Sequence, residues 1–448
     1  MKLLLTHAYF LFEDPKEQQI MKPYAPLGLL YLSSHLRNKG FDVEIYDSTF
    51  GSRNELFQLL RCGPPAVVGV YANLMTRVNA LEIIRSARES GWTVIVGGPE
   101  PANYPEQYLD SGADVVIVGE GELALESFLR CSAHREAWSS IGGLVYRTAD
   151  GQLVTTESAP LIKDLDAQPW PDRDQIDMPR YLDTWRKFHG KGSVSLITAR
   201  GCPYRCNWCS HSVYGMTHRR RSPNAVVNEV EWILERYNPD MLWLADDVFT
   251  IHHGWLFEFA AEMRRRRLSI PFECITRADR VNEKVARTLA DLRCFRVWIG
   301  SESGSQRILN AMQRGVTVDQ VRSAVHLCKS YGIETGMFLM WGYDGEEIED
   351  IELTVEHAKA CQPDVCFTTV SYPIKGTPYY ERVSSRLITL GKWTETTDRE
   401  IRIKGRHSRR FYQHADELLK SELSQTPDPT RTLAAREGLR MTRDEVEA

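Results

Sequence analysis

The chain has 448 residues, 42% hydrophobic and 26% charged, with a formal net charge of −5 at pH 7. This composition is typical of globular proteins, and the length predicts two or three domains of roughly 100–200 residues each. The negative charge argues against nonspecific nucleic-acid binding. The apolar runs fall short of the ~20 residues that cross a bilayer, and no signal-peptide cleavage site follows the first apolar run. We therefore expect a cytoplasmic protein without a transmembrane segment or a nucleic-acid partner.

Residues 1–130 alternate between strand and helix patterns. This alternation predicts a doubly wound, Rossmann-like parallel sheet, in which ligands bind at the carboxyl ends of the strands. Glycine-rich turns stand at two of those ends, in residues 97–99 and 119–122. Strands are expected at 2–9, 41–47, 65–71, 93–98 and 113–122, and helices at 26–40 and 80–91.

The middle of the chain has weaker patterns, and a second strand–helix series follows it. Residues 141–160 predict a hairpin around Asp150-Gly151, and residues 161–190, rich in Pro, Asp and Trp, are interpreted as a linker. The second series predicts a partial (β/α)6 barrel, whose chemistry lies at the carboxyl ends of the strands. Its six strands are expected at 193–201, 240–250, 271–279, 295–304, 332–342 and 364–374.

These patterns divide the chain into four parts. We assign residues 1–145 to the first domain, 146–190 to the hairpin and linker, 191–385 to the barrel, and 386–448 to a C-terminal helical extension. Two basic runs stand out. Residues 264–267 are interpreted as a solvated helix end, whereas residues 218–221 lie close to a cysteine cluster and could meet an anionic substrate or a reductase.

The cysteine cluster lies in the sequence RGCPYRCNWC, where Cys202, Cys206 and Cys209 are separated by three and two residues. A structural zinc site needs four ligands, and His211 or His218 could complete a Cys3His site. A 4Fe–4S cluster normally takes four thiolates, so with three of them one iron keeps an open position for a cofactor or substrate. Both interpretations stay open at this point. The other seven cysteines are isolated, and most of them are interpreted as inert core thiols.

The motif RGCPYRCNWC resembles the signature of radical SAM enzymes, and the resemblance covers roughly residues 192–385. It implies that Cys202, Cys206 and Cys209 hold a 4Fe–4S cluster whose open iron chelates S-adenosyl-L-methionine (SAM). It also implies SAM contacts at the aromatic residue beside the third cysteine, at acidic or polar strand ends, and along an apolar strand. The corresponding positions are Trp208, Asp246, Asp247, Ser301, Glu302, Gly336 and Met340.

Residues 1–130 resemble, as a series, the cobalamin-binding domain of a large radical SAM class. The Asp-x-His-x-x-Gly motif of cobalamin mutases is absent from the sequence, so the resemblance implies cobalamin without a histidine ligand from that motif. The loop after the third strand would face the lower side of the ring, and the glycine turns would approach the nucleotide tail. The implied contacts are Ala72, Asn73, Leu74, Gly97, Gly98, Pro99, Gly119 and Glu120.

The combined resemblance implies a cobalamin-dependent C-methyltransferase. It would act on an unactivated carbon of a small-molecule or natural-product intermediate, through a 5′-deoxyadenosyl radical and methylcobalamin, with electrons from flavodoxin or ferredoxin. An oxidative cyclase or a skeletal-rearrangement enzyme with the same cofactors is the nearest alternative. A methylthiotransferase fits less well, because residues 1–130 contain a single cysteine, Cys62. A cobalamin or iron–sulfur sensor is the alternative from another class.

Overall fold

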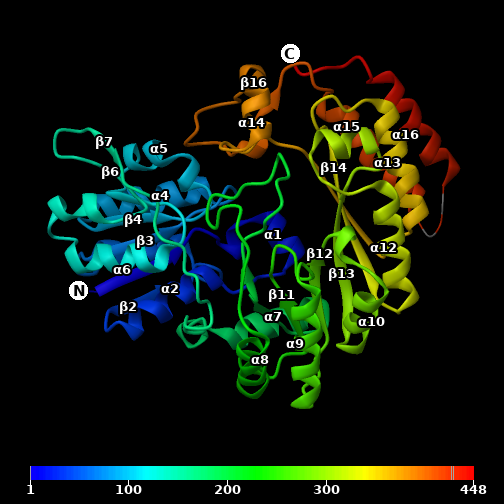
Figure 1. Ribbon diagram of the computed structural model, residues 1–448. Coiled ribbons are helices and arrows are strands. Elements are labelled where there is room, and N and C mark those ends of the chain that lie inside the picture. The colour runs from blue at the N-terminus through cyan, green and yellow to red at the C-terminus, as the bar shows by residue number, and fades with distance from the viewer. Residues whose placement is uncertain (1, 425, 427) are drawn as a thin grey trace.

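The computed structural model describes residues 2–424, 426 and 428–448. Two parallel sheets organise this α/β protein, and Figure 1 shows the first in blue and cyan and the second in green and yellow. None of the helices in the described part of the chain has both the length and the apolar character needed to cross a bilayer. The predicted fold class is confirmed, because each half alternates strands with helices.

The first sheet contains all five predicted parallel strands. The predicted hairpin is also present, and it pairs antiparallel with the last of them, so it extends this sheet. In spatial order the strands are β2 (Asp42–Tyr46), β1 (Lys2–His7), β3 (Val67–Tyr71), β4 (Thr93–Gly97), β5 (Val115–Ile117), β6 (Leu144–Arg147) and β7 (Leu153–Thr155).

Helices cover both faces of this sheet, as a doubly wound fold requires. Successive strand residues point to opposite faces, so Val67 joins one apolar core and Val68 joins the other. One face packs against α3 (Arg53–Cys62), α4 (Arg77–Glu89) and α5 (Pro105–Asp110). The other face packs against α2 (Leu27–Asn38) and α6 (Gly121–Cys131). The short α1 (Pro15–Ile20) precedes them.

The second sheet contains the six predicted barrel strands, and all neighbours pair in parallel. The largest apolar core in the described part of the chain lies between the outer face of this sheet and the helices that cover it. In spatial order the strands are β8 (Ser193–Leu196), β11 (Met241–Leu244), β12 (Phe272–Thr276), β13 (Cys294–Glu302), β14 (Glu334–Trp341) and β15 (Val365–Val370). The outer helices are α8 (Pro223–Tyr237), α9 (His253–Arg265), α10 (Glu283–Asp291), α11 (Gln306–Ala311), α12 (Val318–Ser330) and α13 (Ile348–Cys361).

The interpretation of residues 161–190 as a linker is wrong over its second half, where the helix α7 (Met178–His189) forms. The Asp177 side chain caps its first turn by accepting from the Arg180 N–H at 3.1 Å. Gly190, at φ 73°, ends the helix in the left-handed conformation. One stripe of the helix is buried, with members Met178, Tyr181, Leu182 and Trp185. This helical spacing was present in the sequence, but the surrounding Pro and Asp residues hid it.

The C-terminal part connects the two halves of the molecule. Figure 1 shows α14 (Pro378–Val383) and β16 (Leu387–Ile388) above the junction, whereas α15 (Arg409–Glu422) and α16 (Pro429–Met441) lie beside α13. The strand β17 (Arg402–Ile403) pairs with β16. Between these two strands runs a segment that we call the strap, residues 391–400, which packs against the first domain. Asp398 in the strap forms a buried ion pair with Arg77 at the start of α4.

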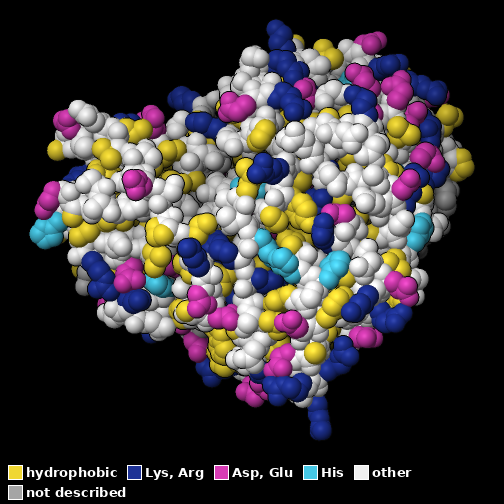
Figure 2. All heavy atoms as spheres, viewed as in Figure 1, with side chains coloured by type: hydrophobic (Ala, Val, Ile, Leu, Met, Phe, Trp, Pro, Cys, Tyr) yellow, Lys and Arg dark blue, Asp and Glu magenta, His cyan; other side chains and the backbone are white. Residues whose placement is uncertain are grey.

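Charges of both signs are interspersed over the face of the molecule that Figure 2 shows. Of the predicted basic runs, residues 264–267 lie at the end of α9, as expected for a helix terminus.

Candidate functional site

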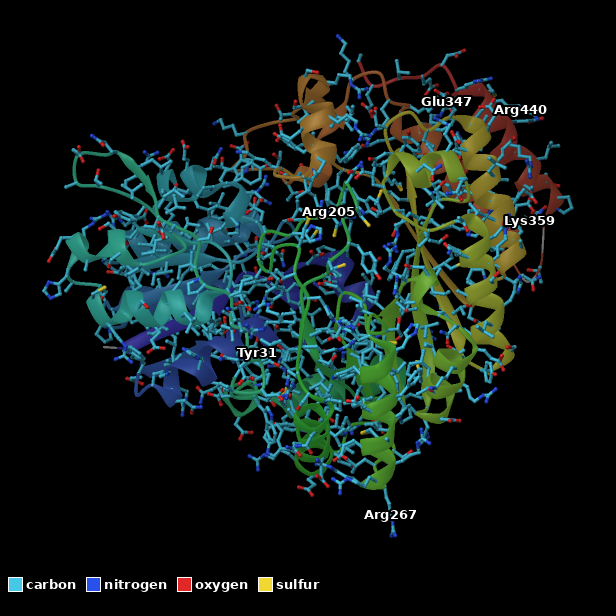
Figure 3. The ribbon with its side chains drawn as sticks, in the orientation of Figure 1. Tyr31, Arg205, Arg267, Glu347, Lys359 and Arg440 are labelled. Atoms are coloured by element: carbon cyan, nitrogen blue, oxygen red, sulfur yellow. The ribbon has the colours of Figure 1, made fainter. Side chains whose placement is uncertain are left out.

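The three clustered cysteines lie in a loop at the carboxyl end of β8, between the two sheets. The strands β9 (Ala199–Arg200) and β10 (Arg219–Arg220) pair at its base and so join the two ends of the loop. Gly201 has φ +84°, and a Cβ there would lie 2.4 Å from the Thr217 carbonyl oxygen, so no other residue fits this turn. Figure 3 places Arg205 of this loop in the middle of the molecule, between the first domain and the barrel.

Asn207, between the second and third cysteines, attaches the loop to the barrel. Its backbone N–H donates to the Met312 carbonyl at 3.0 Å, and its carbonyl accepts from the Tyr379 N–H at 3.0 Å. Its side-chain amide donates to the Ala311 carbonyl at 3.1 Å. These bonds fix the cysteine positions from both sides of the loop.

The cysteines fit a polynuclear iron–sulfur centre better than a single metal ion. Desolvation by the surrounding protein, followed by the neighbouring thiols, raises the pKa of Cys209 to about 12, although its side chain is open to solvent. Desolvation also raises the pKa of the half-buried Cys202. Ligation to iron removes this penalty, because a coordinated thiol is deprotonated. Across the described residues, no three His, Cys, Asp or Glu side chains are placed to share one ion, as a zinc site needs. A cluster binds each cysteine to a different iron, so its ligands can lie farther apart.

A cavity of about 640 Å³ separates the strand ends of the first sheet from the cysteine loop. Cys202 and Asp247 belong to its wall on the barrel side. On the opposite wall lie six of the residues predicted to contact cobalamin: Asn73, Gly97, Gly98, Pro99, Gly119 and Glu120. The remaining two, Ala72 and Leu74, are not part of the wall, and Ala72 is fully buried.

The glycine turns leave bare backbone on the first-domain side of this cavity. Gly98 has φ +118°, and a Cβ there would lie 2.2 Å from the Ala72 carbonyl oxygen. Gly119, at φ +94°, faces Val213 of the cysteine loop, whose carbonyl oxygen would be 3.7 Å from an added Cβ. Glycine lets the backbone approach a ligand closely, because it has no Cβ and adopts positive φ without strain. These turns therefore fit a corrin ring.

Buried ion pairs hold the two sides of the cavity together. Arg200 donates to Glu120 at 2.8 Å and to Glu122 at 2.6 Å, and Arg219 donates to Glu120 at 2.7 Å. The side chains of Arg200, Glu120 and Glu122 are at most 6% exposed. Glu120 is thus paired with Arg200 and Arg219, at the two ends of the cysteine loop. The sequence analysis did not identify Arg200 or Glu122 as residues of this site.

The expectation that the basic run 218–221 meets a substrate or a reductase is wrong for its three arginines. Arg220 pairs with Asp246 at 2.8 Å and Arg221 pairs with the fully buried Glu229. With Arg219 held by Glu120, all three arginines are engaged in intramolecular ion pairs. A run of charges in sequence suggests a solvated surface, but here each neighbouring side chain meets a different buried carboxylate.

The adjacent acidic residues after β11 have different environments. Asp246 is buried and accepts from the backbone N–H groups of Thr198 and Ala199 at 2.7 and 3.1 Å, besides Arg220. Asp247 lies on the cavity wall, and within the described residues its carboxylate has no hydrogen bond or ion pair. Although Asp247 is open to the cavity, desolvation by the surrounding protein and then the Asp246 charge raise its pKa. Asp246 therefore fixes the start of the cysteine loop, and Asp247 is free to meet a ligand.

Ser301 and Glu302 point to opposite sides of β13. The Ser301 hydroxyl shares a hydrogen bond of 3.0 Å with His357 Nε2 of α13, on the helix side of the sheet. Burial lowers the pKa of His357 to about 4, so this imidazole is neutral. Glu302 has a left-handed backbone, φ 63°, and its carboxylate lies 3.6 Å from Arg314 Nε. Positive φ at a non-glycine residue is common at functional sites, and Glu302 faces the barrel interior.

The remaining predicted SAM contacts lie in two apolar groups. Met340 and Trp208 share one cluster at the upper end of the barrel. Gly336 lies under the Trp298 ring, which would be 2.2 Å from a Cβ at position 336. Trp298 in turn stacks on Phe367, with ring centroids 5.3 Å apart. The Trp298 indole therefore fills the space over Gly336.

Two residues near the cysteines were missed by sequence reasoning. Arg277 and Arg314 donate to the Cys206 sulfur at 3.9 and 3.8 Å. Arg277 directly follows β12, a strand end at which functional residues are expected in such barrels. Arg314 follows a short helix, and nothing in its sequence context indicates proximity to Cys206.

Comparison with known proteins agrees with this geometry. Residues 196–358 match the radical SAM superfamily, and residues 20–129 match the B12 binding domain. An uncharacterized methyltransferase of Pyrococcus horikoshii is 29% identical over 394 residues, which are 85% of this chain and 83% of that protein. The anaerobic magnesium-protoporphyrin IX monomethyl ester cyclase of Rubrivivax gelatinosus is 26% identical, with 78% of this chain and 64% of that protein aligned.

A solved structure shares the fold. It is the radical S-adenosylmethionine methyltransferase TsrM from Kitasatospora setae, with cobalamin and a [4Fe-4S] cluster bound. The two chains superpose with a TM-score of 0.71 at 22% sequence identity, over 86% of this chain and 74% of that one.

Proposed function

Because the chain belongs to the cobalamin-dependent radical SAM enzymes, with a 4Fe–4S cluster, SAM and cobalamin as cofactors, we propose that it methylates an unactivated carbon of a small molecule. One observation carries this proposal. The same cavity is bounded by Cys202 and Asp247 on one side and by the glycine turns of the first domain on the other. A methyl carrier and a radical source can therefore face one substrate.

The cofactors would supply the difficult chemistry, namely a radical that abstracts hydrogen and a carrier that transfers a methyl group. The residues of this chain would position them. We assign the cluster to Cys202, Cys206 and Cys209, the SAM methionine and ribose groups to Asp247 and Glu302, and the adenine surroundings to Trp208 and Met340. We assign the corrinoid to the cavity wall formed by residues 97–99 and 119–120, with Asn73. Asp246, Ser301 and Gly336, which the protein's own side chains engage or cover, would act by holding their neighbours.

The protein would also exclude water from this space. The Arg200–Glu120 and Arg200–Glu122 ion pairs hold the first domain against the cysteine loop. Exclusion of water protects reactive intermediates from side reactions. An electron donor such as flavodoxin or ferredoxin would reduce the cluster. We place the enzyme in the cytoplasm, because none of the ten cysteines forms a disulfide and the cytosol keeps thiols reduced.

An oxidative cyclase is the second candidate, because the cyclase of Rubrivivax gelatinosus aligns with 78% of this chain. That reaction would use the same cofactors without methyl transfer. The two candidates differ in the products formed from SAM, so one experiment separates them.

The experiment uses protein reconstituted anaerobically with iron, sulfide and cobalamin, to which SAM and a strong reductant are added. 5′-Deoxyadenosine and S-adenosylhomocysteine are then quantified by mass spectrometry. Both products together support methylation, whereas 5′-deoxyadenosine alone supports the cyclase. Cys206→Ser is expected to abolish both, and Cys62→Ser, which changes an exposed cysteine far from the cluster in sequence, is the matched control. Failure to bind iron would overturn the assignment of the three cysteines.

A further inference from the structure

Two arginines converge on one of the three clustered cysteine sulfurs. Arg277 Nη1 lies 3.9 Å and Arg314 Nη1 lies 3.8 Å from Cys206 Sγ, within the range for hydrogen bonds to sulfur. Both side chains are buried, with exposed fractions of 3% and 7%. Among the described residues, Cys202 and Cys209 receive no such donor from an arginine side chain. The arginine hydrogen-bond donors are therefore directed at one thiol of the three.

Neither arginine can move away easily. Arg277 Nη2 donates to the Arg314 carbonyl at 2.9 Å, and its Nε donates to Asp279 at 2.9 Å. The Arg277 guanidinium also lies over the Tyr204 ring, 3.6 Å from its centroid. Arg314 Nη2 donates to the Gly300 carbonyl at 2.9 Å. Two nitrogens of Arg277 and one of Arg314 are thus anchored elsewhere, and Nη1 of each remains directed at the sulfur.

A guanidinium cannot lose its proton in a protein, so both groups stay charged at every working pH. Their charge is screened less than that of a surface arginine, because they are buried. The counter-charges lie near the Nε atoms and not at Nη1: Asp279 accepts from Arg277 Nε at 2.9 Å, and the Glu302 carboxylate lies 3.6 Å from Arg314 Nε. An N–H donated by a cation to a sulfur is a charge-assisted hydrogen bond, stronger than a neutral one.

We propose that Arg277 and Arg314 are positioning residues that raise the reduction potential of the cluster by donating hydrogen bonds to the Cys206 thiolate. The proposal rests on the proposed function, since it needs the cluster to be bound by the three cysteines. Reduction adds one electron, whose charge spreads over the iron and sulfur atoms. Hydrogen bonds and positive charges at a ligand sulfur stabilise this extra charge and so favour the reduced state.

The test is a redox titration of the reconstituted protein without SAM, in which EPR spectroscopy follows the reduced cluster. It compares wild type with Arg277→Met and Arg314→Met, which keep the apolar stem and remove the donors. Arg280→Met is the matched control. Arg280 lies in the same loop and pairs with Asp279, but it is 38% exposed and does not contact the sulfur.

Each methionine variant is expected to lower the ratio of reduced to oxidised cluster about tenfold at a fixed applied potential. This equals a shift of about 59 mV to more negative potential for a one-electron couple. Arg280→Met is expected to leave the ratio unchanged. A wild-type potential in both Arg277→Met and Arg314→Met would overturn the proposal, as would an equal shift in Arg280→Met.

Failure of the proposed function has a different signature. If wild type binds no iron, the cluster assignment fails, and the role of the arginines fails with it. If a methionine variant alone fails to load iron, the glutamine and lysine variants at that position replace it. Glutamine is expected to lower the potential and lysine to retain it. Identical potentials in these two variants would overturn the proposal even though the cluster is present.

Discussion

The strap and the first domain meet at a buried charge cluster that offers a quantitative test. Arg77 donates from Nε to Glu100 at 2.6 Å and from Nη2 to Asp398 of the strap. Their side chains are 1%, 3% and 2% exposed. Tyr104 donates to the other Asp398 oxygen at 2.9 Å, and the Arg77 guanidinium lies 4.7 Å from the Trp393 ring centroid.

Arg77→Met leaves two buried carboxylates without their cation. Removing one partner of a buried ion pair costs about 3–5 kcal/mol, and we expect a loss of this size in the free energy that holds the strap to the first domain. Limited proteolysis measures it directly, because cleavage of a transiently opened segment follows the population of its open form. The expected result is faster cleavage within residues 391–400 and a lower melting temperature.

Two comparisons make this prediction refutable. Arg88→Met removes a surface pair in which Arg88 is 58% exposed, so its cost should stay within about 1 kcal/mol. The triple variant Arg77→Met/Glu100→Gln/Asp398→Asn should recover much of the loss, because no unpaired charge remains buried. If Arg77→Met behaves like Arg88→Met, the charge cluster does not hold the strap.

Three further changes test the cavity wall and the buried carboxylates. Gly98→Ala puts a Cβ 2.2 Å from a neighbouring carbonyl oxygen and should reduce the cobalamin retained after gel filtration, measured by absorbance. Gly40→Ala, also at positive φ but with open space around it, should retain it fully. Burial raises the pKa of Glu346 from 4.5 to about 8, so the folded state holds a proton that the unfolded state releases, and stability should fall as pH rises between these values. Glu346→Gln should flatten that slope in denaturation experiments at several pH values; an unchanged slope contradicts the assignment. Asp246→Asn should lower the melting temperature because it weakens several buried hydrogen bonds, whereas Asp247→Asn should leave it unchanged; equal effects would contradict the division of roles.

Local patterns predicted the secondary structure well because they depend on neighbouring residues. Buried apolar runs and helical spacing located the five parallel strands of the first sheet and the six strands of the barrel. The error at α7 has a local cause as well. Its apolar spacing is helical, but Pro179 and the flanking Asp residues suggested a loop, whereas proline is well suited to the first turn of a helix.

Side-chain roles were predicted less well because they depend on long-range contacts. The sequence indicates two adjacent acids after β11, but the backbone that follows the strand turns Asp246 into the protein and Asp247 toward the cavity. Ser301 and Glu302 also differ, because they are successive residues of β13 and such residues face opposite sides. Which side holds the cavity depends on how the sheet packs.

The sequence by itself determined the order of the elements and the spacing of Cys202, Cys206 and Cys209, because both are properties of the covalent chain. The tertiary structure decided which charges are paired and which remain free. Residues 219–221 read as one basic run, yet each arginine meets a carboxylate that is distant in sequence or lies on another element. Arg277, 71 positions after Cys206, reaches its sulfur because parallel strands bring their carboxyl ends to one edge of the sheet. Arg314, 108 positions after Cys206, reaches the same sulfur from the turn that follows α11.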